Sequence, residues 1–200
     1  MYKKLLTLVL ALSFALLPLQ QTNASESSAA LTREELADSV MEAYEYITQE
    51  FSIPTSERQI FSDTNQSRYQ MRIVQSYLNG FMNGVGDEKF APEDVVTRSE
   101  AATVLDRLIN CLNIKYDTDQ AMKTINIYDI EDIPDWARQS AVYMSSTGFM
   151  PLNDGRFYPN NPMDKTELTE IIERIKGTFV KFNDVERIDF QTFLERMQQK

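Results

Sequence analysis

A positive charge stands at the start of three similar stretches of the sequence, where it could bind an anion. Each stretch has a capping residue, a cation at the next position and an apolar helical pattern behind it: Arg33 in LTREELADSVMEA, Arg98 in VTRSEAATVLDRL and Lys165 in MDKTELTEIIERI. A cation at the first helical position is unfavourable against the helix dipole unless an anion shares the site. Free helix N–H groups and a guanidinium together form such an anion pocket.

An ion pair is the alternative explanation of these cations. Acids such as Glu93 and Asp94 lie close to Arg98 in the sequence and could neutralise it. The two interpretations differ in what they require around the guanidinium. An open cleft beside Arg98 would favour the anion pocket, whereas burial of Arg98 among acids would leave a plain scaffold.

The residues around each cation predict how the three helices begin. A Thr followed three positions later by Glu forms a capping box, in which each side chain accepts a hydrogen bond from the other residue's backbone N–H. Asp caps a helix as well as Thr does, and each cap stabilises its helix by about 1 kcal/mol. The three predicted pairs are Thr32 with Glu35, Thr97 with Glu100, and Asp164 with Glu167.

The similarity extends upstream and defines a repeated unit. A Phe-x-Pro segment precedes the second and third capping pairs, at Phe90–Pro92 and Phe157–Pro159. Gly80 and Gly148 lie further upstream, each after an amphipathic run with helical spacing. The unit is therefore predicted as a helix, a glycine-bearing loop, a short extended segment and a second helix.

Two whole units and two half-units follow from this pattern. The whole units are 61–112 and 126–177, the half-unit 31–53 holds a second helix, and the half-unit 182–200 holds a first helix. We hypothesise that the two half-units meet in space, which a separation beyond packing distance would reject.

The first 24 residues have the layout of a secretory signal peptide, and 25–30 read as a flexible start. Two lysines precede an apolar run that is shorter than the roughly 20 residues of a membrane span. Cleavage near Ala24 would remove Lys3 and Lys4 and change the net charge from −10 to −12. So acidic a chain is expected to bind neither nucleic acid nor anionic lipid through its overall field. We expect no contact with the membrane after cleavage.

The composition also limits catalysis. The chain has no histidine, which excludes Ser–His and Cys–His nucleophiles and imidazole zinc sites. The single cysteine, Cys111, lies in a helical apolar pattern and is expected to be a buried, unreactive side chain. Asp63 begins a stretch like a calcium loop, but Arg68 replaces the turn glycine. We therefore predict no enzyme, no catalytic residue, no metal and no cofactor.

The ordered motifs resemble the S-layer homology (SLH) domain family. They are FSD, GFMNG, FAP and TRSE in the second unit, and WA, GFM, DGRFYP and DKTE in the third. The resemblance implies a mainly α fold of helix–loop–helix repeats packed as a pseudo-three-fold helical bundle. It also implies an exported protein at the bacterial cell wall or cell surface, bound non-covalently to an anionic secondary wall polysaccharide that often bears pyruvylated sugars.

The resemblance points to particular ligand-binding residues in grooves between units. Arg98 matches the family's arginine best and Arg33 next, while Lys165 keeps the charge without the bidentate fork. Gly84 is the second loop glycine, and Leu152 replaces its counterpart. Trp136 could stack on a sugar, although a Trp at this place in an amphipathic helix is more often a core residue, as are Phe81, Phe90, Phe149, Phe157 and Tyr143.

Two other functions are rivals of wall binding, and catalysis is the weaker of the two. A glycoside hydrolase would need a pair of carboxylates, and Asp129, Glu131 and Asp132 are candidates, but acids are also expected at a helix start. A diverged module that serves as a protein–protein interaction or structural domain in the envelope is the main alternative. An envelope protein would then be the partner in place of the glycan.

Overall fold

The computed structural model describes residues 30–50, 60–112 and 125–180. They form α1 (Arg33–Thr48), α2 (Gln70–Leu78), α3 (Arg98–Cys111), a 3-10 turn (Ile130–Asp132), α5 (Asp135–Ser146) and α6 (Lys165–Val180), and these residues contain no β-strand. The predicted mainly α fold is confirmed. The predicted signal peptide, most of the flexible start and the half-unit 182–200 lie outside the described residues.

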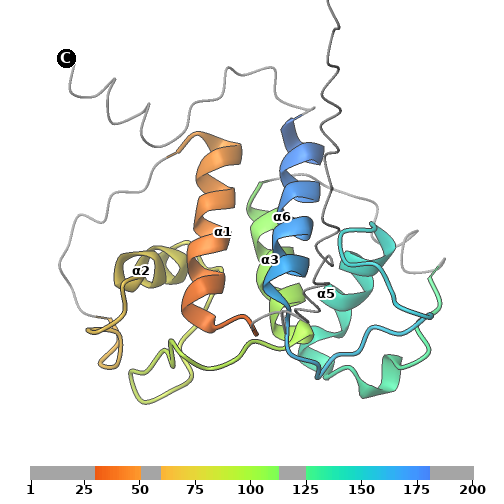
Figure 1. The fold of residues 1–200 in the computed structure, drawn as a ribbon, viewed down its shortest axis with the longest axis horizontal. Coiled ribbons are helices and arrows are strands. Elements are labelled where there is room, and N and C mark those ends of the chain that lie inside the picture. Colours follow the sequence, from red (N-terminus) through yellow and green to blue (C-terminus); the bar gives the residue numbers. More distant parts are fainter. Residues whose placement is uncertain (1–29, 51–59, 113–124, 181–200) are drawn as a thin grey trace, which may run out of the picture.

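The three helices with the cationic starts lie side by side. Figure 1 shows α1, α3 and α6 upright next to one another, and α1 contacts both α3 and α6. The shorter helices are peripheral, with α2 packed on α1 and α5 packed on α3. The described residues therefore hold two helix pairs, α1 with α2 and α3 with α5, and the single helix α6. The pseudo-three-fold symmetry of the whole stays a prediction, as does the division into units.

Local capping explains where these helices begin. A capping box opens α1 at Thr32 and α3 at Thr97. At α6 the Asp164 carboxylate accepts hydrogen bonds from the backbone N–H groups of Thr166 and Glu167, at 2.7 and 3.1 Å. The caps predicted from the sequence therefore start all three helices.

A closed ring of backbone hydrogen bonds joins the residues just before the three caps. The N–H of Leu31 donates to the carbonyl of Met163, that of Met163 to Val96, and that of Val96 back to Leu31, at 2.9, 2.7 and 2.9 Å. All three side chains are buried. Each helix start is thus held by the other two, although the residues are far apart in the chain.

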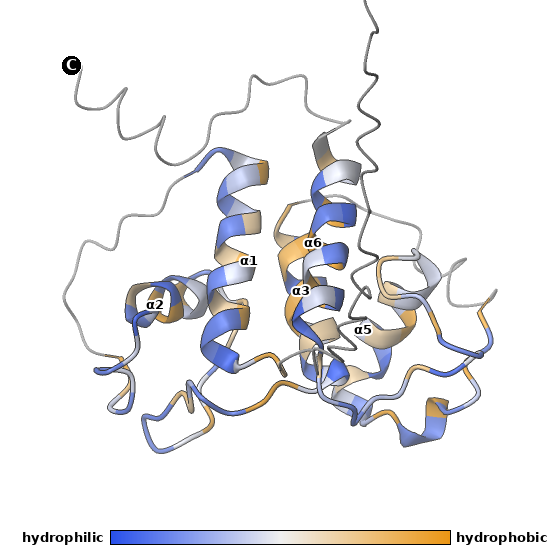
Figure 2. Ribbon diagram, in the orientation of Figure 1, coloured by the Kyte–Doolittle hydropathy of each residue, from blue (hydrophilic) through white to orange (hydrophobic). Residues whose placement is uncertain are grey.

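The apolar side chains pack into one core between the helices. Each helix carries both hydrophobic and hydrophilic turns in Figure 2, as amphipathic helices around a shared core do. The five aromatic residues predicted to be core are buried: Phe81, Phe90, Phe149, Phe157 and Tyr143. Within the described ranges, no helix combines the length and the apolar composition that a membrane crossing requires.

Two residues expected in the core lie at the surface. Trp136 is 60% exposed, because the buried stripe of α5 runs through Ala137, Ala141 and Met144 and leaves Trp136 beside it. Cys111 is also exposed. It is the last residue of α3 and lines an open cavity at that end of the bundle, so its helical pattern does not bury it.

Candidate functional site

Two aspartates hold the Phe-x-Pro loops in place. The Asp63 carboxylate accepts hydrogen bonds from the N–H groups of Phe90 and Ala91, at 2.9 and 2.8 Å. Asp129 does the same for Phe157 and Tyr158, at 2.7 and 2.8 Å. Burial raises the pKa of Asp63, but its hydrogen bonds with the Phe90 and Ala91 amides outweigh this, so the pKa lies below its usual range.

Each of these loops then covers the start of a helix from the preceding unit. The N–H groups of Arg33 and Glu34, at the start of α1, donate to the carbonyls of Asp94 and Pro92, both at 2.9 Å. At the start of α3 the N–H groups of Arg98 and Ser99 donate to Asn161 and Pro159, at 3.0 and 3.1 Å. The expectation of free N–H groups at these two helix starts is therefore wrong, since loop carbonyls of the following unit occupy them.

Arg33 is fixed against the loop of the next unit and keeps part of its guanidinium open. Its Nε donates to the carbonyl of Phe90 and its Nη2 to that of Asn83, each at 2.8 Å. The guanidinium also lies 4.7 Å from the centre of the Phe90 ring. Its Nη1 makes no hydrogen bond to the described part of the chain, and the residue is half-buried.

The charges around Arg33 are mixed. Burial lowers the pKa of its guanidinium, while the nearby charges of Glu100, Asp94 and Asp63 act in the opposite direction. The arginine therefore carries its charge in a partly desolvated, acid-flanked place. An anion bound here would have to gain by direct hydrogen bonds, because the surrounding field does not attract it.

Arg98 repeats the contacts of Arg33 but is closed off. Its Nε donates to the carbonyl of Phe157 at 2.7 Å, and its guanidinium lies 5.1 Å from the centre of the Phe157 ring. Its Nη1 forms an ion pair with the Glu167 carboxylate, and the residue is 8% exposed. The pair is the alternative weighed from the sequence, but its partner is the capping glutamate of α6 and not Glu93 or Asp94. Arg98 is therefore buried in an ion pair and does not line the open cleft that the anion pocket would require.

Lys165, like Arg98, pairs with the capping glutamate of another helix. Its Nζ lies 2.7 Å from the Glu35 carboxylate, so the cation at the start of α6 contacts the capping glutamate of α1. Burial raises the pKa of Glu35, but Lys165 and Thr32 together lower it more, so the net pKa is lowered. Of the three cations, Arg33 is the one that pairs with no carboxylate in the described residues, although the Glu100 charge acts on it.

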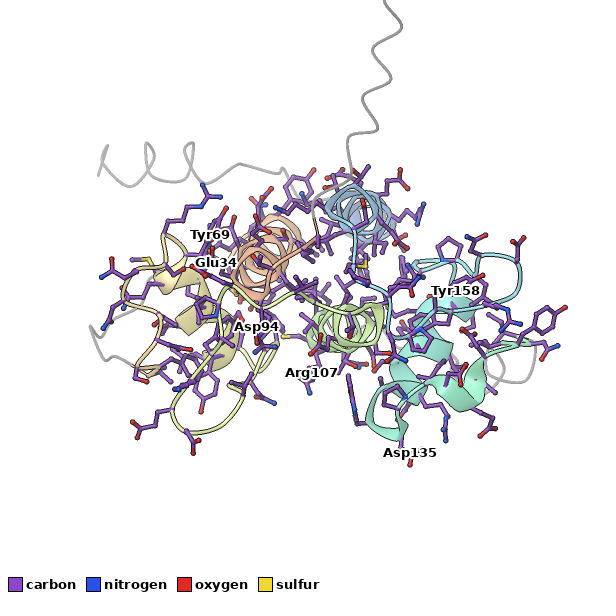
Figure 3. All side chains as sticks on the ribbon, turned by 60° about the horizontal axis from the view of Figure 1, so that its bottom comes forward. Glu34, Tyr69, Asp94, Arg107, Asp135 and Tyr158 are labelled. Carbon is purple, nitrogen blue, oxygen red and sulfur yellow. The ribbon has the colours of Figure 1, made fainter. Side chains whose placement is uncertain are left out.

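Gly84 and Trp136 lie in different surroundings from each other. A Cβ at Gly84 would lie 2.6 Å from both the carbonyl oxygen of Lys89 and a ring carbon of Phe61, so the loop packs tightly there. Trp136 lies on the outside of α5. Figure 3 labels Glu34, next to Arg33, and Asp135, next to Trp136, in well-separated parts of the molecule. The structure therefore does not bring Trp136 to the Arg33 site.

The double hydrogen bonds of Asp63 and Asp129 were missed in the sequence. Both acids follow a hydrophobic residue by two positions and precede their loop partners by nearly the same distance, and this spacing is the signal that could have found them. Asp63 does not start a helix, because α2 begins at Gln70.

A cavity of about 200 Å³ lies away from these helix starts. It is lined by Tyr44, Ile47, Thr48, Glu50, Cys111, Leu112 and Phe179. Burial and a hydrogen bond to Glu50 raise the pKa of Tyr44 to about 12. Among the described residues, no three acidic, Cys or His side chains gather as a metal ion would require.

Comparison with known proteins finds a family match for one segment of the chain. Residues 77–102, which span the glycine loop, the Phe-x-Pro segment and the start of α3, match the S-layer homology domain. The chain is 32% identical over 80 residues to an endoglucanase of Bacillus sp. (strain KSM-635), and the match covers 40% of this chain but 8% of that protein. So small a share does not transfer that enzyme's activity. S-layer homology domains are generally non-catalytic cell-wall-binding modules. Residues 77–102 therefore carry S-layer homology sequence, and the predicted resemblance to that family is confirmed.

Proposed function

We propose that this protein is exported and attaches without covalent bonds to the bacterial cell wall, by binding an anionic, pyruvylated secondary wall polysaccharide. The match of residues 77–102 to a family of wall-binding modules carries this proposal. The absence of histidine from the sequence is consistent with a binding module. The site would lie where the start of α1 meets the loop of the unit 61–112.

Arg33 is the residue that best fits contact with the ligand. Two carbonyls and the Phe90 ring fix its guanidinium, and Nη1 is left to donate. Such a fixed donor loses little entropy when it binds a carboxylate of a pyruvyl ketal. The sequence predicted Arg98 as the best ligand-binding residue. We now rank Arg33 first, because the guanidinium of Arg98 is already paired with Glu167.

The remaining candidates have narrower roles in this proposal. Gly84 shapes the loop whose Asn83 carbonyl holds Arg33. Lys165 and Arg98 would reach a ligand only by leaving Glu35 and Glu167. Trp136 offers an exposed ring at a separate place on α5, where a sugar could stack.

Sedimentation with purified cell walls tests the proposal. The protein should co-sediment with intact walls and lose binding when acid treatment strips the secondary polymer. Arg33→Ala should weaken binding at least about tenfold, and Arg33→Lys should fall between, since it keeps the charge but not the planar fork. Arg138→Ala, which removes an arginine from the outside of α5 paired with Asp135, is the matched control.

A protein partner in the envelope is the second candidate. The outer side of α2 exposes Met71 and Leu78, at 61% and 65%, which is unusual for large apolar side chains. Binding that survives both acid treatment and Arg33→Ala would reject the glycan proposal in favour of a protein partner. Loss of binding in the double variant Met71→Ser and Leu78→Ser alone would then identify the surface.

A further inference from the structure

The cations and the capping glutamates of the three long helices pair in a regular order. The cation of α3 pairs with the capping glutamate of α6, and the cation of α6 pairs with the capping glutamate of α1. The third pair in this order would join Arg33 of α1 to Glu100 of α3, two helices that contact each other. Within residues 30–50, 60–112 and 125–180 this pair does not form. The order is thus open at one place, between Arg33 and Glu100.

Glu100 is half-buried and uses one of its two carboxylate oxygens for the cap of α3. Its Oε2 accepts hydrogen bonds from the N–H and the hydroxyl of Thr97, at 2.8 and 3.0 Å. In Glu35 one oxygen likewise accepts from the N–H of Thr32, at 3.0 Å, and the other contacts Lys165. The second oxygen of Glu100 has no such cation in the part of the chain that the structure describes. Glu100 therefore keeps a charged acceptor for another donor.

A loop carbonyl holds Arg33 in place near this acceptor. The Nε of Arg33 and the Nε of Arg98 both donate to a Phe carbonyl, but Arg33 also donates from Nη2 to the carbonyl of Asn83. Burial lowers the pKa of Arg33, and of the charges that oppose this lowering, that of Glu100 acts most strongly. The Nη1 of Arg33 and the second oxygen of Glu100 are therefore a donor and an acceptor in the same place.

Such a pair selects a ligand by what it donates as well as by its charge. A bare carboxylate would gain the Nη1 donor of Arg33 but would meet the negative charge of Glu100. A hydroxyl beside the carboxylate would instead donate to Glu100, and a hydrogen bond to a charged acceptor is strong. Taking from the proposed function only the place of the ligand, we propose that Glu100 determines specificity at the Arg33 site. The site binds carboxylates that carry a neighbouring hydroxyl group and discriminates against those that carry none.

Three small acids of equal carbon number test this specificity. They are propanoate, which has no hydroxyl group, 2-hydroxypropanoate and 3-hydroxypropanoate. In NMR spectra of the full chain, the Nε–H signal of Arg33, identified by its loss in Arg33→Ala, reports binding at this place. At least one of the hydroxy acids should bind about tenfold more tightly than propanoate. Equal affinities, or no shift of the signal with any of the three acids, would overturn the proposal.

Glu100→Gln tests the acceptor itself. Glutamine at this position still forms a capping box, and with its oxygen on the N–H of Thr97 its amide turns an N–H donor towards the ligand. The advantage of the hydroxy acids should disappear, and propanoate should bind more tightly than it does to the parent. Glu170→Gln, which removes the same charge from the exposed side of α6, should leave the advantage unchanged. An advantage that persists in Glu100→Gln would contradict the proposal.

Sedimentation with cell walls separates this proposal from the proposed function. If the parent binds no walls, but the hydroxy acids have their advantage and lose it in Glu100→Gln, wall binding fails and the specificity of the site stands. If the walls bind and Arg33→Ala releases them, while the hydroxy acids have no advantage, wall binding stands and the role of Glu100 is refuted.

Discussion

The guanidinium of Arg98 forms an ion pair with the carboxylate of Glu167, which lies in the next unit of the chain. The backbone N–H of Glu167 in turn donates a hydrogen bond to the capping carboxylate of Asp164. One side chain at the start of α3 is thereby joined to the start of α6. Arg98 thus links two units of the fold.

A double-mutant cycle should measure this link. Arg98→Ala is expected to lower the free energy of unfolding by about 2 kcal/mol, because the part-buried Glu167 carboxylate and the carbonyl of Phe157 both lose their donor. The coupling energy between Arg98→Ala and Glu167→Gln should be about 1 kcal/mol in chemical denaturation. The exposed pair Arg174 and Glu170 on α6 should couple by only about 0.3 kcal/mol, and equal coupling in the two cycles would contradict the assignment.

Asp63→Asn should destabilise the protein, because an amide oxygen cannot replace both acceptor oxygens of the carboxylate. The expected loss is about 1.5 kcal/mol at pH 7. Since the folded pKa of Asp63 is lowered, its contribution is present above the unfolded pKa of about 4 and is lost as the pH falls through the folded pKa. Denaturation of the variant should therefore depend less on pH below about pH 4 than that of the parent. Asp135→Asn, at a carboxylate that is 91% exposed, should leave this profile unchanged.

Gly84→Ala should lower the free energy of unfolding by about 2 kcal/mol. The new methyl group would meet the backbone carbonyl of Lys89, which cannot move aside without shifting the loop. Gly177→Ala on α6 is the control, since a Cβ there meets nothing within 4 Å, and it should stabilise the helix by up to about 1 kcal/mol. If the two variants had equal melting temperatures, tight packing at Gly84 would be refuted.

The backbone ring makes a prediction for amide hydrogen exchange. The N–H groups of Leu31, Val96 and Met163 are buried and bonded to one another. They should exchange only through global unfolding, with nearly equal protection. NMR exchange should show the N–H of Gln49, at the end of α1, exchanging many times faster. Fast exchange at any one of the three ring positions would mean that the ring opens independently.

Cys111 should react slowly despite its exposure. Partial desolvation of the thiol at the cavity and the charge of Glu50 raise its pKa, so the reactive thiolate is scarce at neutral pH. Alkylation by iodoacetamide should rise about tenfold per pH unit up to about pH 8, because the pKa of the thiol lies above its usual value. Glu50→Gln should speed the reaction at pH 8, because it removes the carboxylate charge that raises the pKa of the thiol, while Glu88→Gln should have no effect. A rate plateau below pH 8 would show that the thiol is not shifted upwards.

The sequence predicted the parts of the fold that depend on neighbours along the chain. Thr97 and Glu100 lie three residues apart, so their capping box can be recognised without any knowledge of the tertiary structure. The buried Phe90 and Phe157 were likewise found from the repeated Phe-x-Pro segments. Such local features follow from short-range hydrogen bonding and from the helical period.

The contacts between units could not be predicted in the same way. Backbone carbonyls of Asp94 and Pro92 fill the start of α1, and a backbone carbonyl carries no mark in the sequence. The prediction that Trp136 is a core residue is wrong because Trp136 lies one position before Ala137, at which the buried stripe of α5 begins. A shift of one position along a helix is enough to move a side chain out of such a stripe. Arg33 and Arg98 stand in the same motif and differ in their partners from the next unit. Arg33 meets the carbonyl of Asn83, whereas Arg98 meets the carboxylate of Glu167.

The ring formed by Leu31, Val96 and Met163 also restricts how this architecture can grow. Each of the three positions uses its donor on one neighbour and its acceptor on the other, so the circle has no open end at which a fourth member could join. Duplication of a single unit would therefore leave one helix start outside the ring. Duplication of all three units would instead build a second, separate ring. Longer relatives built on the same ring are accordingly expected to contain such units in multiples of three.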